Sequence, residues 1–188
     1  VKPAVIDNKR LIEAPSKLLK TMQKTILKDL KVLNIPGNIF SGVKNRSHIG
    51  NITQHSGKYH FMKIDLSKFF PHIKRDIVYN FYKIKFNLPS DIANILTNLS
   101  TIDLKRIDLS NFNDLQKNNY ENALLFMQNK EIKVLNHLTT GSRISPILSY
   151  LVNEEMFNEI EQFCKNHNVF FTIYVDDMAF SSNKKTSG

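Results

Sequence analysis

The sequence predicts an α+β fold, in which helices alternate with strands that pair only across long separations. Segments with apolar residues three and four apart predict helices, and short apolar runs that end on acidic or turn residues predict strands. The 188 residues include 41% hydrophobic residues and thirteen Phe, enough for one domain with a sizeable core. The chain shows no internal repeat, and no linker divides it.

Five segments are predicted to be helical. The first begins at Ala14-Pro15-Ser16 and stops before Ile35-Pro36-Gly37. The clearest begins at Ser145-Pro146, since Pro suits the first turn of a helix, and extends over 146–166. The expected ranges are 16–33, 74–86, 90–99 with Ser90 as the N-cap, about 120–129, and 146–166.

The strands are predicted around three acidic residues. Phe61–Asp65 forms an apolar strand that ends on an acid, and a strand–turn–strand follows the last helix with Asp176 and Asp177 at its bend. Residues 37–58 are rich in Gly, Asn and Ser, which indicates a loop with short structure, and 100–135 are mostly polar.

Charge and composition restrict the class of protein. Residues 1–75 hold fifteen Lys and Arg against four Asp and Glu, a net charge of +11, whereas residues 76–188 have a net charge of −2. A basic first half is typical of a nucleic-acid partner, although a solvated lysine-rich surface explains the charge alone equally well. One Cys, Cys164, excludes an internal disulfide framework. No segment has transmembrane length and no secretory signal is present, so we expect a cytoplasmic protein without membrane contact.

The three acids predict a metal site. A single Asp at a strand end is usually a cap or turn residue. If the two strands lie side by side, however, Asp65, Asp176 and Asp177 meet at one end of the sheet, and carboxylates in apolar surroundings are costly unless a cation pairs with them. Such an oxygen cage suits Mg²⁺ with substrate phosphates.

These acids lie within motifs that resemble those of reverse transcriptases, particularly the bacterial retron type. "MKIDLSKFFPHI", "TTGSRISPILSYLVN" and "TIYVDDMAFSS" resemble three palm motifs in the family's order. "KRLIEAPSKLLKTMQKTIL" and "FSGVKNRSHIGNITQH" resemble the first two fingers blocks. The resemblance implies a right-hand polymerase fold, with an antiparallel palm sheet, a Tyr-x-Asp-Asp hairpin and helices packed on the sheet. It also implies an RNA-directed DNA polymerase that uses an RNA template, a DNA or RNA primer and dNTPs, with a cognate structured non-coding RNA, msDNA synthesis and phage defence.

The resemblance also assigns the site residues. Asp65 and Asp176 would hold two Mg²⁺ or Mn²⁺ ions, with Asp177 assisting and the carbonyl of Leu66 completing one metal shell. Phe70 would be the steric gate against the ribose 2′-hydroxyl, although Phe at this position is also compatible with ordinary core. The other residues implied at the nucleotide are Thr140, Gly141, Arg143, Arg10 and Lys9, and those implied at the nucleic acid are Lys44, Arg46, Tyr174 and Val175.

The implied domain organisation places the fingers at 1–60, with further fingers segments within 74–140, and the palm at 61–73 and 141–188. No thumb is expected in this chain, so we expect these residues to fold but not to polymerise alone. The sequence departs from the family at Thr139-Thr140-Gly141, where Pro-Gln-Gly is usual, and at Ile52, where retrons usually carry Ala. Another bacterial defence (abortive-infection) or group II intron-type reverse transcriptase, and a non-catalytic nucleic-acid-binding module, stay open. We expect His48, His60, His72, His137 and His167 to be structural or surface residues.

Overall fold

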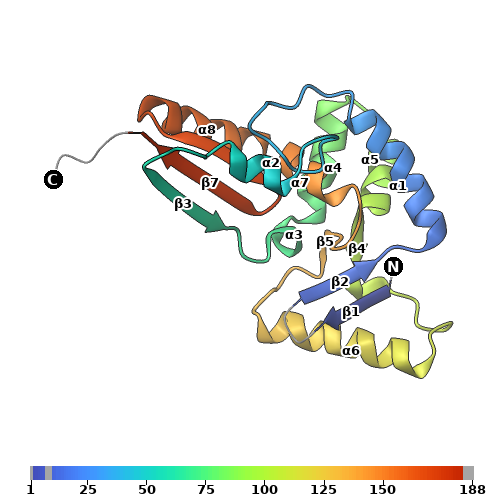
Figure 1. Ribbon diagram of the computed structural model, residues 1–188. Coiled ribbons are helices and arrows are strands. Elements are labelled where there is room, and N and C mark those ends of the chain that lie inside the picture. The colour runs from blue at the N-terminus through green and yellow to red at the C-terminus, as the bar shows by residue number, and fades with distance from the viewer. Residues whose placement is uncertain (1, 7–9, 184–188) are drawn as a thin grey trace. The chain divides into compact units, whose positions relative to one another are not determined.

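The computed structural model describes residues 2–6 and 10–183 (Figure 1). The chain divides into two compact units. Unit 1 comprises Val1–Asp29 and Phe70–Ser145, and unit 2 comprises Leu30–Phe69 and Pro146–Gly188. Each unit has its own antiparallel strands and helices, and none of the described helices is both long and apolar enough to cross a bilayer.

Unit 1 contains a hairpin that the sequence did not predict. Strands β1 (Lys2–Ile6) and β2 (Arg10–Ala14) pair in antiparallel register, and α6 (Asp114–Asn129) packs against β1. Helix α6 begins earlier than expected because Asn113 and Gln116 form a reciprocal capping box that stabilises a polar first turn. The core between these elements is apolar and consists of Leu11, Ile102, Leu104, Ala123, Met127 and Ile132.

The remaining helices of unit 1 agree closely with the predicted ranges. Helix α1 spans Lys17–Leu30, with its last residue in unit 2, and α3 (Phe69–His72) crosses the other boundary. Helix α4 (Arg75–Asn80) continues as one π-helical segment (Phe81–Lys85), and α5 spans Ser90–Ser100. The N-cap prediction is wrong by one position: Pro89 is the cap, with extended ψ and no side-chain bond, and Ser90 is already helical. Two short strands, β4 (Thr101–Asp103) and β5 (Asn136–Leu138), pair antiparallel, and a 3₁₀ turn (Leu104–Arg106) follows β4.

Unit 2 is built on a three-stranded antiparallel sheet. Its strands are β3 (His60–Asp65), β6 (Phe170–Tyr174) and β7 (Asp177–Ser182), in the order β3-β7-β6. Helices α2 (His48–Thr53) and α8 (Glu154–Asn166) contact β6. Accordingly β6 and β7 carry buried residues, whereas every residue of the edge strand β3 is exposed although its sequence is largely apolar.

The long helix predicted at 146–166 is two helices, α7 (Ser145–Val152) and α8. The break is at Asn153, whose φ of −116° and ψ of 19° are not helical. Its side-chain amide donates to the carbonyl of Ser149 at 2.8 Å, a local side-chain bond of the kind that competes with regular helix. Beyond the break, Phe157 and Cys164 are buried in α8, whereas Phe163 is 64% exposed.

Candidate metal and nucleotide site

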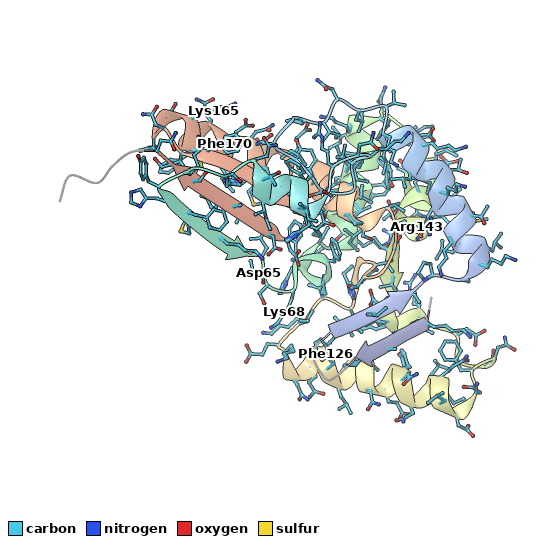
Figure 2. The ribbon with its side chains drawn as sticks, viewed as in Figure 1. Asp65, Lys68, Phe126, Arg143, Lys165 and Phe170 are labelled. Carbon is cyan, nitrogen blue, oxygen red and sulfur yellow. The ribbon has the colours of Figure 1, made fainter. Side chains whose placement is uncertain are left out.

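The three acids predicted to form a metal site all belong to unit 2 and lie at one end of its sheet. Asp65 ends β3, as Figure 2 shows, and is the antiparallel partner of Asp177, which begins β7. Asp176 precedes it in the two-residue turn between β6 and β7. The carbonyl of Asp176 accepts a hydrogen bond from the amide of Leu66 at 2.8 Å, which joins the end of β3 to the turn.

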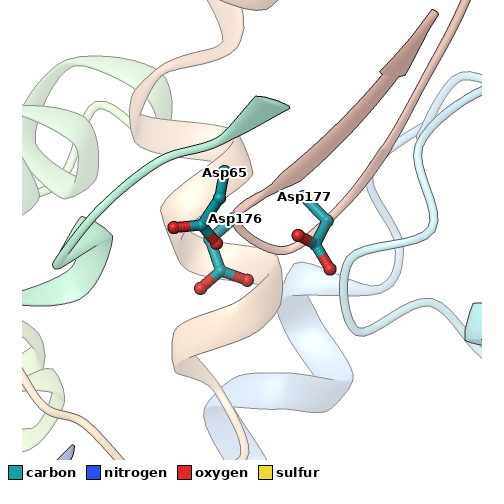
Figure 3. Close-up of side chains that lie close together, drawn as sticks. All are labelled: Asp65, Asp176 and Asp177. Carbon is teal, nitrogen blue, oxygen red and sulfur yellow. The ribbon is translucent and has the colours of Figure 1, made fainter. Parts of the chain in front are cut away.

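The pairing of the strands brings the carboxylates together (Figure 3). One oxygen from each of Asp65, Asp176 and Asp177 lies within 4.8 Å of the others. Burial, together with the charges of Asp65 and Asp177, raises the pKa of Asp176 above its ordinary value. Lys63 supplies a positive charge beside the acids: its Nζ lies 2.8 Å from Asp177 Oδ1, and that hydrogen bond raises the pKa of Lys63.

This donor set fits a hard divalent cation. Carboxylate and carbonyl oxygens are the ligands that Mg²⁺ and Mn²⁺ use, and the group contains no soft ligand. Three carboxylates beside one lysine leave like charges close together, and a divalent cation relieves their repulsion. Among the residues that the structure describes, this is the one group of three or more potential metal ligands.

The loop that follows β5 carries Thr140, Gly141 and Arg143, which the sequence assigns to the nucleotide. All three, with Phe70, belong to unit 1. Gly141 has φ of +95°, and a Cβ there would lie 3.3 Å from Ile12 Cγ2, so both the conformation and the space require glycine. Arg143 is exposed, and the buried hydroxyl of Thr140 has no hydrogen-bond partner among the described residues.

The loop is held by buried polar groups from distant parts of unit 1. Glu13 bonds Thr140 twice: its carboxylate accepts from the Thr140 amide at 2.8 Å, and its own amide donates to the Thr140 carbonyl at 2.7 Å. The hydroxyl of Ser142 donates to the side chain of Gln23 at 2.8 Å. Thr139 donates to the carbonyl of Ser100 at 3.0 Å through its hydroxyl. The loop is therefore preorganised by β2, α1 and the end of α5.

His137 completes this arrangement. Its Nε2 lies 2.9 Å from Glu13 Oε1, and both side chains are 0% exposed. Its Nδ1 lies 2.9 Å from the carbonyl of Val134, an acceptor, so Nδ1 carries a proton. The Nε2 therefore shares one proton with the carboxylate, and the pair forms a buried hydrogen-bonded bridge. The prediction that His137 is structural is confirmed.

The predicted steric gate lies beside a residue with a clear packing role. Phe69 contacts Phe157 edge to face at 6.3 Å, and Phe157 is buried. Phe70 is half-buried in α3, where its carbonyl accepts from the Ile73 amide at 3.0 Å. The assignment of Phe70 to the nucleotide stays a prediction.

The basic residues predicted from the resemblance differ in what they contact. Lys9 lies outside the described residues, and Arg10 is placed in β2 by its backbone. Lys44 is exposed. Arg46 instead donates to the carbonyls of Pro36, Ile39 (2.6 Å) and Ile35 (3.3 Å), so its guanidinium stabilises the 35–39 segment. Tyr174 is half-buried and contacts the ring of His48 edge to face at 5.2 Å.

Sequence reasoning missed the buried residues that support the loop after β5 and the turn before β7. Glu13, Gln23 and Ser41 are almost fully buried polar residues, and a single sequence gives no signal that distinguishes them from surface positions. Their partners lie 119 to 134 residues away along the chain, at Thr140, Ser142 and Val175.

The chain is similar to one protein family and to two curated proteins. The family described as reverse transcriptase (RNA-dependent DNA polymerase) matches residues 2–187. The retron Ec83 reverse transcriptase of Escherichia coli is 23% identical over 177 residues, which cover 94% of this chain and 49% of the relative. The retron Se72 reverse transcriptase of Salmonella heidelberg (strain 579083-10) is 28% identical over 97 residues, 51% of this chain and 26% of the relative. The chain thus spans half or less of the length of these relatives.

Proposed function

Because the chain belongs to the reverse transcriptase family, we propose that it is the fingers and palm portion of a retron-type RNA-directed DNA polymerase. The observation that supports this most is the acid group: Asp65, Asp176 and Asp177 lie in motifs that match the family and share one end of a sheet. In this proposal the sheet of unit 2, with its Tyr-x-Asp-Asp hairpin, belongs to the palm at 61–73 and 141–188. The fingers comprise 1–60 and segments within 74–140.

The acids would hold two Mg²⁺ or Mn²⁺ ions. Asp65 and Asp176 are the proposed ligands of both, with Asp177 beside them and the Leu66 carbonyl as a further ligand. When bound, the ions activate the primer 3′-hydroxyl and stabilise the leaving pyrophosphate. Lys63 would hold Asp177 in place through the contact at 2.8 Å.

The loop at 139–145 would position the incoming dNTP. Glu13 occupies the Thr140 amide, so the Thr140 hydroxyl, which has no partner among the described residues, is the group left to donate to a nucleotide. Gly141 would let the nucleotide approach the backbone, Arg143, Arg10 and Lys9 would bind its phosphates, and Phe70 would exclude the ribose 2′-hydroxyl. Lys44, Arg46, Tyr174 and Val175 are proposed to contact the template and primer.

The retron assignment rests on the relatives, both of which are named retron reverse transcriptases. By that likeness the partners would be an RNA template, a DNA or RNA primer, dNTPs and a cognate structured non-coding RNA, in the cytoplasm. The product would be msDNA, and the biological role phage defence.

Primer extension on an RNA template, with the full-length protein and Mg²⁺, tests this function. We expect dNTP incorporation that EDTA abolishes and that Asp176→Asn reduces by at least about a hundredfold, since metal ligands act on the reacting atoms. Asp108→Asn is the matched control, because Asp108 is an exposed acid in unit 1 that caps the Ser110 amide. Nucleic-acid binding with no metal-dependent extension would instead favour a non-catalytic binding module.

A second experiment tests the proposed role of Phe70 as the steric gate. Phe70→Val should raise ribonucleotide incorporation relative to deoxyribonucleotide incorporation, because the smaller side chain leaves room for the 2′-hydroxyl. Phe69→Val is the neighbouring control and should lower stability without changing this ratio. Unchanged discrimination in an active Phe70→Val enzyme would make Phe70 an ordinary core residue.

A further inference from the structure

The turn that carries Asp176 has an unusual backbone. Tyr174 pairs with Asp177, so the turn consists of Val175 and Asp176 alone. Val175 has φ of 61°, whereas Asp176 is not among the residues with positive φ, a pattern typical of a type II′ turn. Glycine is preferred at the first position of that turn, and a β-branched residue there is strained by about 1–3 kcal/mol. Such a conformation persists only when the surrounding structure holds it.

One group that holds it is the side chain of Ser41. The Val175 amide donates to Ser41 Oγ at 2.8 Å, and Ser41 is 0% exposed. The bond is therefore shielded from water, and its loss would leave a turn amide without this acceptor.

Ser41 is itself fixed by the backbone on either side of it. The segment before it runs parallel to β6: the Ile173 amide donates to Asn38 at 3.0 Å, and the Phe40 amide donates to Ile173 at 2.8 Å. After it, Gly42 has φ of +66°, and a Cβ there would lie 3.0 Å from the backbone nitrogen of Ile147. The chain therefore has little freedom to move Ser41 away from the turn.

We propose that Ser41 is a positioning residue for the acid-bearing turn, and that its hydroxyl sets the affinity of the acid group for divalent cations. The turn has two anchors: the Leu66 amide fixes the carbonyl of Asp176, and Ser41 fixes the amide before Asp176. Together they fix both sides of the residue whose carboxylate joins those of Asp65 and Asp177. The proposal rests on the proposed function, in which these acids hold metal.

The affinity of the acid group for Mn²⁺ can be measured directly by titrating the full-length protein with Mn²⁺ in the absence of nucleic acid. Electron paramagnetic resonance detects the free ion. We expect Ser41→Ala to weaken Mn²⁺ binding about five- to tenfold, the size of one buried hydrogen bond. Ser149→Ala is the matched control, a fully buried serine of unit 2 whose hydroxyl donates to the carbonyl of Pro146 within α7. It should bind Mn²⁺ like the wild type.

The double variant Ser41→Ala with Val175→Gly separates positioning from simple stability. Glycine adopts positive φ without strain, so the turn should no longer depend on the hydroxyl, and Mn²⁺ affinity should return to within about twofold of Val175→Gly alone. If Ser41→Ala does not fold, Ser41→Cys, with a weaker acceptor of similar size, should give a smaller loss of affinity.

The outcomes separate this proposal from the function on which it rests. If folded Ser41→Ala, or Ser41→Cys in its place, binds Mn²⁺ like the wild type, the hydroxyl serves folding alone and the proposal is wrong. If the wild type and Asp176→Asn bind Mn²⁺ equally, the acids are not a metal site, and the proposed function fails first.

Discussion

The loop at Gly141 and the turn at Val175 both require positive φ, yet only the loop carries glycine. In unit 1 the loop has the residue that its conformation prefers, and the polar side chains of Glu13, Gln23 and Ser142 hold it in place. In unit 2 the turn has a β-branched residue in a strained conformation, held by the Ser41 hydroxyl and the Leu66 amide. The comparison teaches that the turn places a strained β-branched residue next to the acids, where three carboxylates also lie close together.

The largest effect should come from removing the buried anchor of the loop. Glu13→Ala leaves His137 and the Thr140 amide without their carboxylate, and we expect a loss of about 3–5 kcal/mol in the free energy of unfolding. Chemical denaturation measures it.

Two further variants sharpen that result. In Glu13→Gln the carbonyl can still accept from Thr140 and the amide can donate to a neutral His137, so most of the stability should remain. Glu121→Ala, an exposed glutamate of α6, should change stability by no more than about 0.5 kcal/mol. Equal effects of Glu13→Ala and Glu121→Ala would show that the loop does not depend on the bridge.

Gly141→Ala should give the next largest effect, because it introduces both strain and a contact with Ile12. We expect a destabilisation of about 1–3 kcal/mol, measured by thermal or chemical unfolding. Gly57→Ala is the control: Gly57 also has positive φ, at +75°, but its Cβ would meet nothing within 4 Å. Gly57→Ala should lower the free energy of unfolding by less than Gly141→Ala does. An equal loss in the two variants would mean that the contact with Ile12 is unimportant.

Val175→Gly should have the opposite sign. Relief of the strained φ outweighs the added flexibility of the unfolded chain. We therefore expect the free energy of unfolding of the metal-free protein to rise by about 0.5 kcal/mol. Thermal unfolding in EDTA measures it. A clear loss of stability would show that Val175 is not strained, and would remove the contrast between the turn and the loop.

The smallest effect concerns pH and the buried His55 of unit 2. Its ring nitrogens lie 2.7 Å from the hydroxyls of Ser181 and Thr172, Phe61 and Phe170 pack against the ring, and Lys58 is the charged group acting on it. Burial, and then Lys58, lowers the pKa of His55 below its ordinary value of 6.5. The unfolded chain therefore takes up a proton more readily, and stability should fall as the pH drops below about 6.5, by less than about 0.5 kcal/mol.

His55→Gln should remove that pH dependence, whereas His60→Gln, at an exposed position of β3, should retain it. Unfolding curves recorded across this pH range compare the two. A wild-type protein with constant stability over the range would contradict the assignment of His55 as a buried neutral residue.

Much of the fold was predictable because it depends on local pattern. The helices at α1, α4, α5 and α8 and the strands at β3, β6 and β7 follow from apolar spacing and turn residues, which act over a few positions. The β1–β2 hairpin and the short β4–β5 pair were not predicted, because charged or polar residues and Pro3 leave these strands few apolar positions, whereas the equally short β6 is apolar apart from Thr172. The break at Asn153 was also missed, since a single amide bonding its own helix leaves no periodic signal.

By itself the sequence determined the acids, the order of the motifs and the elements that carry them, because each depends on residue type and short-range spacing. Only the tertiary structure decided that Asp65 pairs with Asp177 and that β3 is an exposed edge. It also decided that Glu13 and His137 support the loop of unit 1 and that Ser41 supports the turn of unit 2. The physical reason is that burial and hydrogen bonds between residues some 110 to 135 positions apart are properties of chain topology. A buried glutamate and an exposed one have the same letter in the sequence, and they differ only in the atoms that the fold places around them.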